Sequence, residues 1–109
     1  SGAGEALLFN PAGALVGAAM ANAFLLLDGV WTTPARECGA RDGVVRAWVL
    51  EAVGGREEVI DPEMPRRCRA AFLTNSRIGV RPVEAIDGRP LELACASIRR
   101  RYHDEVFSR

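Results

Sequence analysis

Short apolar runs separated by turn-forming residues constrain the fold of this sequence more than any other feature. Two of the turns are Asp-Gly pairs, Asp28-Gly29 and Asp87-Gly88. Asp-Gly between apolar runs is a strong signal for a tight β-hairpin, because both residues tolerate the positive φ angles that such a turn needs. The pattern therefore predicts a mixed α/β (α+β) domain whose strands are connected mainly by hairpins.

The same reasoning locates the elements along the chain. Apolar runs bounded by turn residues predict strands at 5–9, 14–16, 23–27, 30–33, 57–60, 70–73, 83–86 and 90–91. Apolar positions at helical spacing predict a helix from about 43 to 53, a short helical turn within 62–69 and a helix over 93–107. The sequence contains no internal repeat and no low-complexity linker, so we expect residues 1–109 to form a single domain.

Composition argues against several classes of function. The chain carries 14 acidic and 14 basic side chains, whereas a nucleic-acid binder needs clustered positive charge. No apolar stretch reaches the roughly 18 residues that span a bilayer. The 3 cysteines and the single His103 stand at no metal-ligand spacing. We therefore expect no metal site, no nucleic-acid or membrane partner, and a reducing, cytoplasmic setting.

Two short segments have the character of a phosphate site. Gly43-Val44-Val45 opens the first predicted helix, where free backbone N–H groups and the helix dipole favour an anion. Thr74-Asn75-Ser76 ends a predicted buried strand and supplies two hydroxyls and an amide. Each segment alone is more often purely structural, but together they could hold one phosphate from two sides.

The order of segments resembles the large, C-terminal domain of the fold-type IV pyridoxal-phosphate (PLP) enzymes, also called class IV aminotransferases. The matching stretches are Glu5-Ala6-Leu7-Leu8-Phe9-Asn10 with Gly13, Met20-Ala21-Asn22-Ala23-Phe24-Leu25, Asp28-Gly29 through Thr33-Pro34, Cys38-Gly39, Gly43-Val44-Val45-Arg46, Phe72-Leu73-Thr74-Asn75-Ser76, Gly79-Val80-Arg81-Pro82-Val83 and Ile86-Asp87-Gly88-Arg89-Pro90-Leu91. The resemblance spans nearly the whole chain.

The resemblance implies a hairpin-rich sheet or pseudo-barrel with flanking helices, and a PLP cofactor. The amides of Val44 and Val45 and the loop at Asn75 and Ser76 would contact the cofactor phosphate. Arg46 matches an arginine at the helix start of the family, and we expect it to be structural. The family also implies a small-molecule substrate and a homodimer that includes a small N-terminal domain.

Within the family, Met20-Ala21-Asn22 and Cys38-Gly39 are more similar to 4-amino-4-deoxychorismate lyases than to branched-chain aminotransferases. Those lyases release pyruvate from aminodeoxychorismate to form 4-aminobenzoate for folate synthesis. Two alternatives stay open. One is an aminotransferase of the branched-chain or D-amino acid type, and the other is a non-catalytic relative that serves as a binding partner.

The sequence departs from the family at the residues that carry catalysis. All 14 basic residues are arginine, so these residues include no lysine to bind the cofactor aldehyde, and we expect no catalytic residue in this chain. In the family that lysine lies upstream of the stretch matching Glu5 to Asn10, so we expect both the lysine and the small N-terminal domain to be absent from this chain. The missing lysine therefore favours a fragment of a longer enzyme.

Two further departures favour a degenerate relative instead. Gly17 stands five residues before Asn22, where the family carries a glutamate that pairs with the ring nitrogen of the cofactor. Gly17 could equally be kept for close backbone packing. Asp42 precedes Gly43, where its carboxylate would suit a helix N-cap but would repel a phosphate. Asn22 itself either lines the cofactor cleft or satisfies a buried backbone group.

Overall fold

A computed structural model describes residues 7–18, 21–35, 43–75, 79–86, 89–92 and 96–107. The strands are β1 (Leu7–Phe9), β2 (Leu15–Ala18), β3 (Asn22–Leu27), β4 (Val30–Pro34), β5 (Arg56–Glu58), β6 (Ala71–Asn75), β7 (Gly79–Pro82), β8 (Ala85–Ile86) and β9 (Arg89–Pro90). The helices are α1 (Val44–Val53), α2 (Met64–Arg67) and α3 (Ala96–Tyr102), which continues as a π-helical turn, η2 (His103–Phe107).

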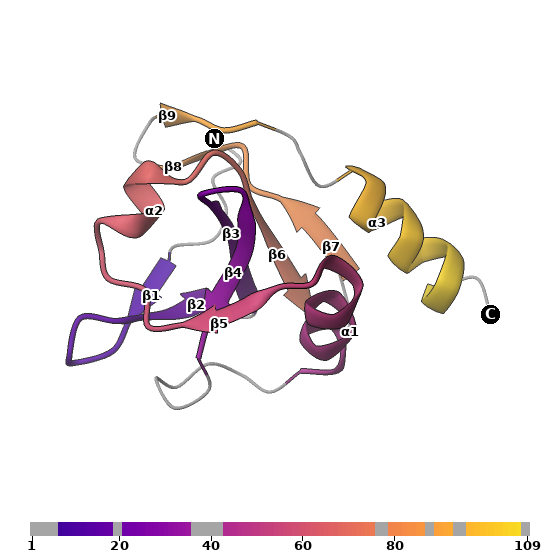
Figure 1. The fold of residues 1–109 in the computed structure, drawn as a ribbon, viewed down its shortest axis with the longest axis horizontal. Coiled ribbons are helices and arrows are strands. Elements are labelled where there is room, and N and C mark those ends of the chain that lie inside the picture. The colour runs from indigo at the N-terminus through magenta and orange to yellow at the C-terminus, as the bar shows by residue number, and fades with distance from the viewer. Residues whose placement is uncertain are drawn as a thin grey trace.

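A five-stranded sheet in the order β5-β4-β3-β6-β7 forms the centre of the fold (Figure 1). The pairs β3–β4, β3–β6 and β6–β7 are antiparallel, while β5 lies parallel to β4. Two small antiparallel pairs, β1–β2 and β8–β9, flank this sheet. The predicted mixed α/β architecture with hairpin-connected strands is thus confirmed, except that β4, α1 and β5 form a parallel crossover.

The Asp28-Gly29 hairpin adopts the predicted geometry. Asp28 has φ 50° and Gly29 has φ 78°, and Leu27 pairs with Val30 across the turn. Positive φ at both central residues is what a tight, right-twisted hairpin requires. At the second predicted hairpin, Ile86 pairs with Arg89, while Asp87 and Gly88 lie outside the described residues.

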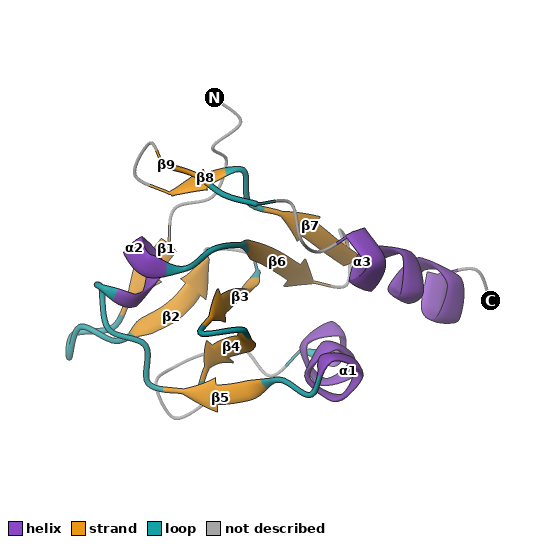
Figure 2. Ribbon diagram, turned by 45° about the horizontal axis from the view of Figure 1, so that its top comes forward, coloured by secondary structure: helices purple, strands orange, loops and turns teal. Residues whose placement is uncertain are grey.

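Side chains alternate between the two faces of the central sheet, so each face carries its own apolar cluster. Figure 2 shows α1 and α3 on one side, and α2 with the β1–β2 pair on the other. The cluster beneath α1 and α3 contains Phe24, Val45, Val49, Phe72, Val80, Ile98 and Tyr102. The cluster on the opposite face contains Leu15, Leu25, Leu27, Ile60, Cys68, Ala71 and Leu91.

Helix α1 has the predicted bounds, and its buried face positions its first turn. Gly54 ends it in the left-handed conformation with φ 61°, which glycine adopts without a steric cost. Val45, Arg46 and Val49 are buried against the sheet, whereas the Val44 side chain is 83% exposed. The first turn therefore packs on one side and stands open on the other.

Some elements differ from the sequence prediction. β7 was not expected, and it forms because Val80 has a place in the cluster beneath α1 and Gly79–Pro82 can pair along β6. β6 extends through Asn75, so Thr74 and Asn75 belong to a strand rather than to a loop. Within the described residues, no helix is long and apolar enough to cross a membrane.

Candidate phosphate-binding site

The first turn of α1 presents backbone amides without a side-chain cap. The N-cap is Gly43, in an extended conformation, and as a glycine it has no side chain to cap the helix start. The first turn contains no acidic residue. The first N–H groups of a helix have no intrahelical acceptor, so the amides of Val44 and Val45 are oriented toward an anion at this end. The N-cap is thus one residue later than Asp42, which lies outside the described residues.

Asn22 connects this helix start to the central strands. Its side chain is buried, and its Nδ2 atom lies 3.3 Å from the position that a β-carbon on Gly43 would occupy. Glycine at 43 therefore lets the helix start approach the Asn22 amide closely. Asn22 pairs with Thr74 across β3 and β6. The structure thus brings together the two segments, 43–45 and 74–75, that the sequence analysis associates with one phosphate.

Thr74 carries an unpaired buried hydroxyl. The residue is fully buried, and its Oγ1 atom has no hydrogen-bond partner among the described residues. Thr74 faces the α1 side of the sheet, because it lies two residues after Phe72 in β6 and so on the same face. The Phe72 ring stacks on Phe24, with centroids 5.0 Å apart, in the cluster beneath α1. A buried polar atom without a partner is costly, so this hydroxyl is a group that a ligand could satisfy.

The other predicted contacts are placed only in part. Asn75 is the last residue of β6, is partly buried and pairs with Gly79. Ser76 lies outside the described residues. The sequence indicates the Thr-Asn-Ser segment as a whole and does not distinguish the Thr74 hydroxyl from its neighbours. The missing signal was the pairing of Thr74 with Asn22, because register between distant strands cannot be read from either strand alone.

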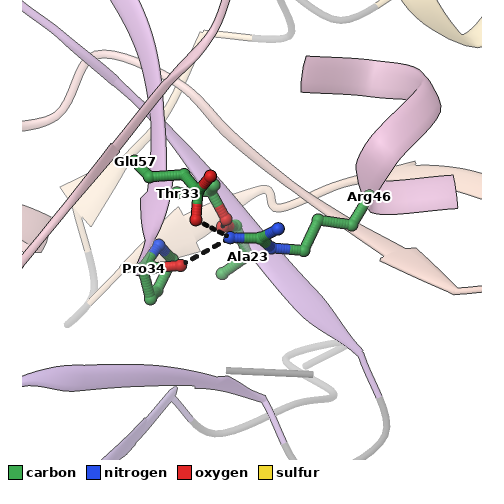
Figure 3. Close-up of polar contacts among 5 residues, drawn as sticks. All are labelled: Ala23, Thr33, Pro34, Arg46 and Glu57. Atoms are coloured by element: carbon green, nitrogen blue, oxygen red, sulfur yellow. Dashed lines mark hydrogen bonds and ion pairs between the residues drawn. The ribbon is translucent and has the colours of Figure 1, made fainter. Parts of the chain in front are cut away.

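Arg46 anchors the first turn of α1 to two strands (Figure 3). Its guanidinium is buried, and one nitrogen, Nη2, donates to the Pro34 carbonyl at 3.0 Å and to Glu57 Oε1 at 2.7 Å. Pro34 ends β4, and Glu57 lies in β5. The expected structural role of Arg46 is confirmed by these contacts. Its Nε atom is buried and has no hydrogen-bond partner among the described residues.

Gly17 is held in a conformation that excludes a side chain. Its φ is +150°, and a β-carbon there would lie 2.9 Å from the Ala21 carbonyl oxygen, closer than real contacts of this kind. A glutamate at this position would require the backbone of β2 or of residue 21 to move. The interpretation that Gly17 permits close backbone packing therefore has direct support in the geometry.

The described titratable groups outside this region include no second candidate site. Burial raises the pKa of the Cys68 thiol above its ordinary value, and the nearby Arg89 only partly offsets this. His103 is exposed, as are Arg99 and Arg100, so this part of the basic run faces solvent. Arg101 is also exposed but contacts α1. Among the described residues no three His, Cys, Asp or Glu side chains gather as metal ligands would.

Comparison with solved structures finds the same fold in two kinds of enzyme. A 4-amino-4-deoxychorismate lyase from Pseudomonas aeruginosa is 26% identical with a TM-score of 0.83, over 94% of this chain and 41% of that one. A branched-chain aminotransferase from Thermoproteus uzoniensis is 27% identical with a TM-score of 0.86, over 95% of this chain and 37% of that one. The chain therefore spans about two fifths of the length of these enzymes.

A third solved structure has the same fold. A branched-chain amino acid aminotransferase from Thermobaculum terrenum, solved in its PLP form, has a TM-score of 0.85 at 23% identity, over 96% of this chain and 38% of that one. No protein with a curated description matches the chain. The sequence model of the amino-transferase class IV family matches residues 1–86, which is most of the chain. This chain therefore belongs to the class IV aminotransferase family.

Proposed function

We propose that this chain is the cofactor-binding domain of a PLP-dependent enzyme, and that the start of α1 with Asn22 and Thr74 holds the cofactor phosphate. The observation that carries this proposal is the fully buried hydroxyl of Thr74, which has no hydrogen-bond partner among the described residues. Thr74 pairs with Asn22, whose amide lies against the helix start at Gly43. A phosphate there would accept hydrogen bonds from the free amides and the hydroxyl at once. The residues present therefore fit the phosphate end of the cofactor.

In this arrangement the chain's own groups bind and orient. The amides of Val44 and Val45 donate to the phosphate, and Thr74 adds one hydroxyl donor. Asn75 and Ser76 are the further proposed contacts at the end of β6. When bound, PLP supplies an electron-withdrawing ring that stabilises negative charge on the substrate carbon. The lysine for its aldehyde would come from elsewhere, because these 109 residues contain none.

For the complete protein we favour 4-amino-4-deoxychorismate lyase activity in a cytoplasmic homodimer. The Met20-Ala21-Asn22 and Cys38-Gly39 segments support it, as does the similarity to the lyase from Pseudomonas aeruginosa. Aminotransferase activity is the second candidate, because the Thermoproteus uzoniensis aminotransferase is equally similar. Product analysis separates the two. Formation of 4-aminobenzoate and pyruvate supports the lyase, whereas a new amino acid formed from an added keto acid supports the aminotransferase.

A non-catalytic role is the third candidate, favoured by the geometry at Gly17. The ring nitrogen of PLP needs a nearby carboxylate to stay protonated, and Gly17 supplies none. If the full-length protein binds the phosphorylated cofactor but forms neither product, the non-catalytic role is supported. Such a protein would keep the phosphate end of the site and lose the chemistry at the ring end.

Binding of two vitamers tests the phosphate site without any aldehyde chemistry. Pyridoxine 5′-phosphate and pyridoxine differ only in the phosphate, so the ratio of their dissociation constants measures what the phosphate contributes. We expect the full-length protein to prefer pyridoxine 5′-phosphate by at least about tenfold, roughly one charge-assisted hydrogen bond. A ratio near one would reject the proposed phosphate site.

Two threonine variants give this test a matched control. Thr74→Val removes the unpaired hydroxyl and should lower the preference for the phosphate. Thr33→Val makes the same change at another fully buried threonine, whose Oγ1 donates to the Ala23 carbonyl at 2.7 Å. Because that hydroxyl already has a partner, Thr33→Val should leave the preference unchanged. Equal preferences in the two variants would exclude Thr74 from the site.

A further inference from the structure

Arg46 occupies an unusual place for a buried charge. It is the third residue of α1 and so belongs to the same turn as Val44 and Val45. Its side chain runs from the helix to the strands, and the residue is only 3% exposed (Figure 3). Whatever fixes this side chain therefore also fixes the turn that carries the proposed phosphate donors.

The contacts of Arg46 converge on the parallel strand pair. Its Nη2 atom donates to the Pro34 carbonyl at 3.0 Å and to the Glu57 carboxylate at 2.7 Å. Pro34 is the last residue of β4, and Glu57 pairs with Thr33 in the β4–β5 register. One nitrogen thus ties the first turn of the helix to the end of the preceding strand and to the strand that follows the helix.

Energetic considerations favour a positional role over a purely stabilising one. Taking a guanidinium out of water is costly, and an apolar side chain of similar volume often packs as well. Here the cost is only partly offset, since Arg46 Nε has no partner among the described residues and the Glu57 side chain is 41% exposed. Unlike an apolar side chain, these directional hydrogen bonds fix both the distance and the orientation between the helix start and the strands.

The opposite end of α1 is attached differently. Arg101 of α3 donates to the Ala52 carbonyl at 3.3 Å in the last turn of α1, and its guanidinium lies 5.7 Å from the ring centroid of Trp48. Arg101 is exposed and also pairs with Glu105 at 3.0 Å. The helix is therefore held by a buried arginine at its first turn and by an exposed arginine at its last.

We infer that Arg46 is a positioning residue, which sets the first turn of α1 against β4 and β5 so that its amides meet a phosphate. This inference rests on the proposed phosphate site. The contacts of Arg46 that fix its position go to the protein, since its Nη2 donates to Pro34 and Glu57. Its effect would pass through the placement of the Val44 and Val45 amides.

The test compares Arg46→Met with Arg101→Met in the full-length protein. We would measure the ratio of the dissociation constants of pyridoxine and pyridoxine 5′-phosphate, together with thermal unfolding. A loss of general stability alone would leave this ratio unchanged. We expect Arg46→Met to lower the ratio severalfold toward one, because displaced amides make longer and weaker hydrogen bonds to the phosphate. Arg101→Met should keep the wild-type ratio.

The outcomes separate this inference from the proposal beneath it. A folded Arg46→Met variant with the wild-type ratio would overturn the positioning role. A wild-type ratio near one would instead reject the phosphate site. If Arg46→Met does not fold, Glu57→Ala takes its place, since it removes one acceptor of Arg46 at a half-exposed residue. A severalfold fall in the ratio in Glu57→Ala supports the role, and no change overturns it.

Discussion

The two ends of the proposed cofactor site are built in opposite ways. At the phosphate end, α1 starts at Gly43 without a side-chain cap, and the buried Thr74 hydroxyl has no partner among the described residues. At the ring end, Gly17 offers no side chain, and the Ala21 carbonyl fills the space where one would begin. One end is prepared for a ligand, and the other is closed by the protein's own backbone.

In the proposed site, cofactor binding and chemistry at the ring depend on different groups. A phosphate site made of backbone amides depends on the course of the chain, so it survives many side-chain changes. Protonation of the ring nitrogen depends on one carboxylate, and a single substitution removes it. Once Gly17 takes a positive φ against a neighbouring carbonyl, the reverse substitution becomes difficult.

The largest expected effect tests whether the ring end is closed. Gly17→Ala should lower the free energy of unfolding by about 3 kcal/mol, since it combines positive-φ strain with a backbone overlap. Gly13→Ala is the matched control. Gly13 has φ +89°, but a β-carbon there meets nothing within 4 Å, so only the strain applies. We expect about 1 kcal/mol for that variant, measured by urea denaturation.

Equal losses of unfolding free energy in Gly17→Ala and Gly13→Ala would contradict the proposed difference between the two ends of the site. They would mean that the Ala21 carbonyl moves aside readily, and that the ring end could accept a glutamate. In that case Gly17→Glu should be tolerated in the full-length protein. If Gly17→Ala is instead more destabilising than Gly13→Ala, Gly17→Glu should destabilise the protein at least as much as Gly17→Ala.

The second prediction contrasts an available hydroxyl with one that is already bonded. Thr33→Val removes a hydrogen bond to the Ala23 carbonyl and should cost about 1 kcal/mol of unfolding free energy. Thr74→Val replaces an unpaired buried hydroxyl by a methyl group, so without ligand it should be neutral or stabilising. Chemical denaturation without and with pyridoxine 5′-phosphate measures both. A loss of stability in ligand-free Thr74→Val would show that its hydroxyl has a structural partner.

The sequence predicts those parts of this comparison that depend on local chemistry. Asp28-Gly29 determines its own turn, and Gly54 ends α1, because each conformation is set by two or three neighbouring residues. The sequence also predicted a helix start at Gly43-Val44-Val45 and a structural role for Arg46, which makes buried contacts with two strands. The binding of a phosphate by the Val44 and Val45 amides stays a prediction.

The parts that could not be predicted depend on residues far apart in sequence. Asn22 meets both Thr74 and the start of α1 only because of the register between β3 and β6. The parallel pairing of β4 with β5 likewise determines that Glu57 becomes the partner of Arg46. At Gly17, the sequence shows the absent carboxylate, but only the path of the backbone shows that a side chain is excluded.

A smaller effect sharpens the description of the phosphate end. Gly43→Ala should cost about 0.5–1 kcal/mol, because alanine is a poor N-cap. Its β-carbon would lie 3.3 Å from Asn22 Nδ2, so the Asn22 amide must shift by a few tenths of an ångström. We therefore expect a lower preference for pyridoxine 5′-phosphate over pyridoxine as well. If stability falls while the preference stays unchanged, close approach to Asn22 is not needed for phosphate binding.

The smallest expected effect uses Cys68 to monitor packing near the ring end. Cys68 shares an apolar cluster with Leu15, two residues before Gly17, and burial raises the pKa of its thiol. The unfolded chain then releases this proton at a lower pH than the folded chain. The stabilisation is therefore complete below the unfolded pKa of about 8.5 and is lost as pH rises through the higher folded value.

Between pH values of about 7 and 9.5, the wild type should lose more unfolding free energy than Cys68→Ser, which lacks the titrating thiol. Equal losses would mean that the cluster admits water readily, and that the ring end is less tightly closed than Gly17 indicates.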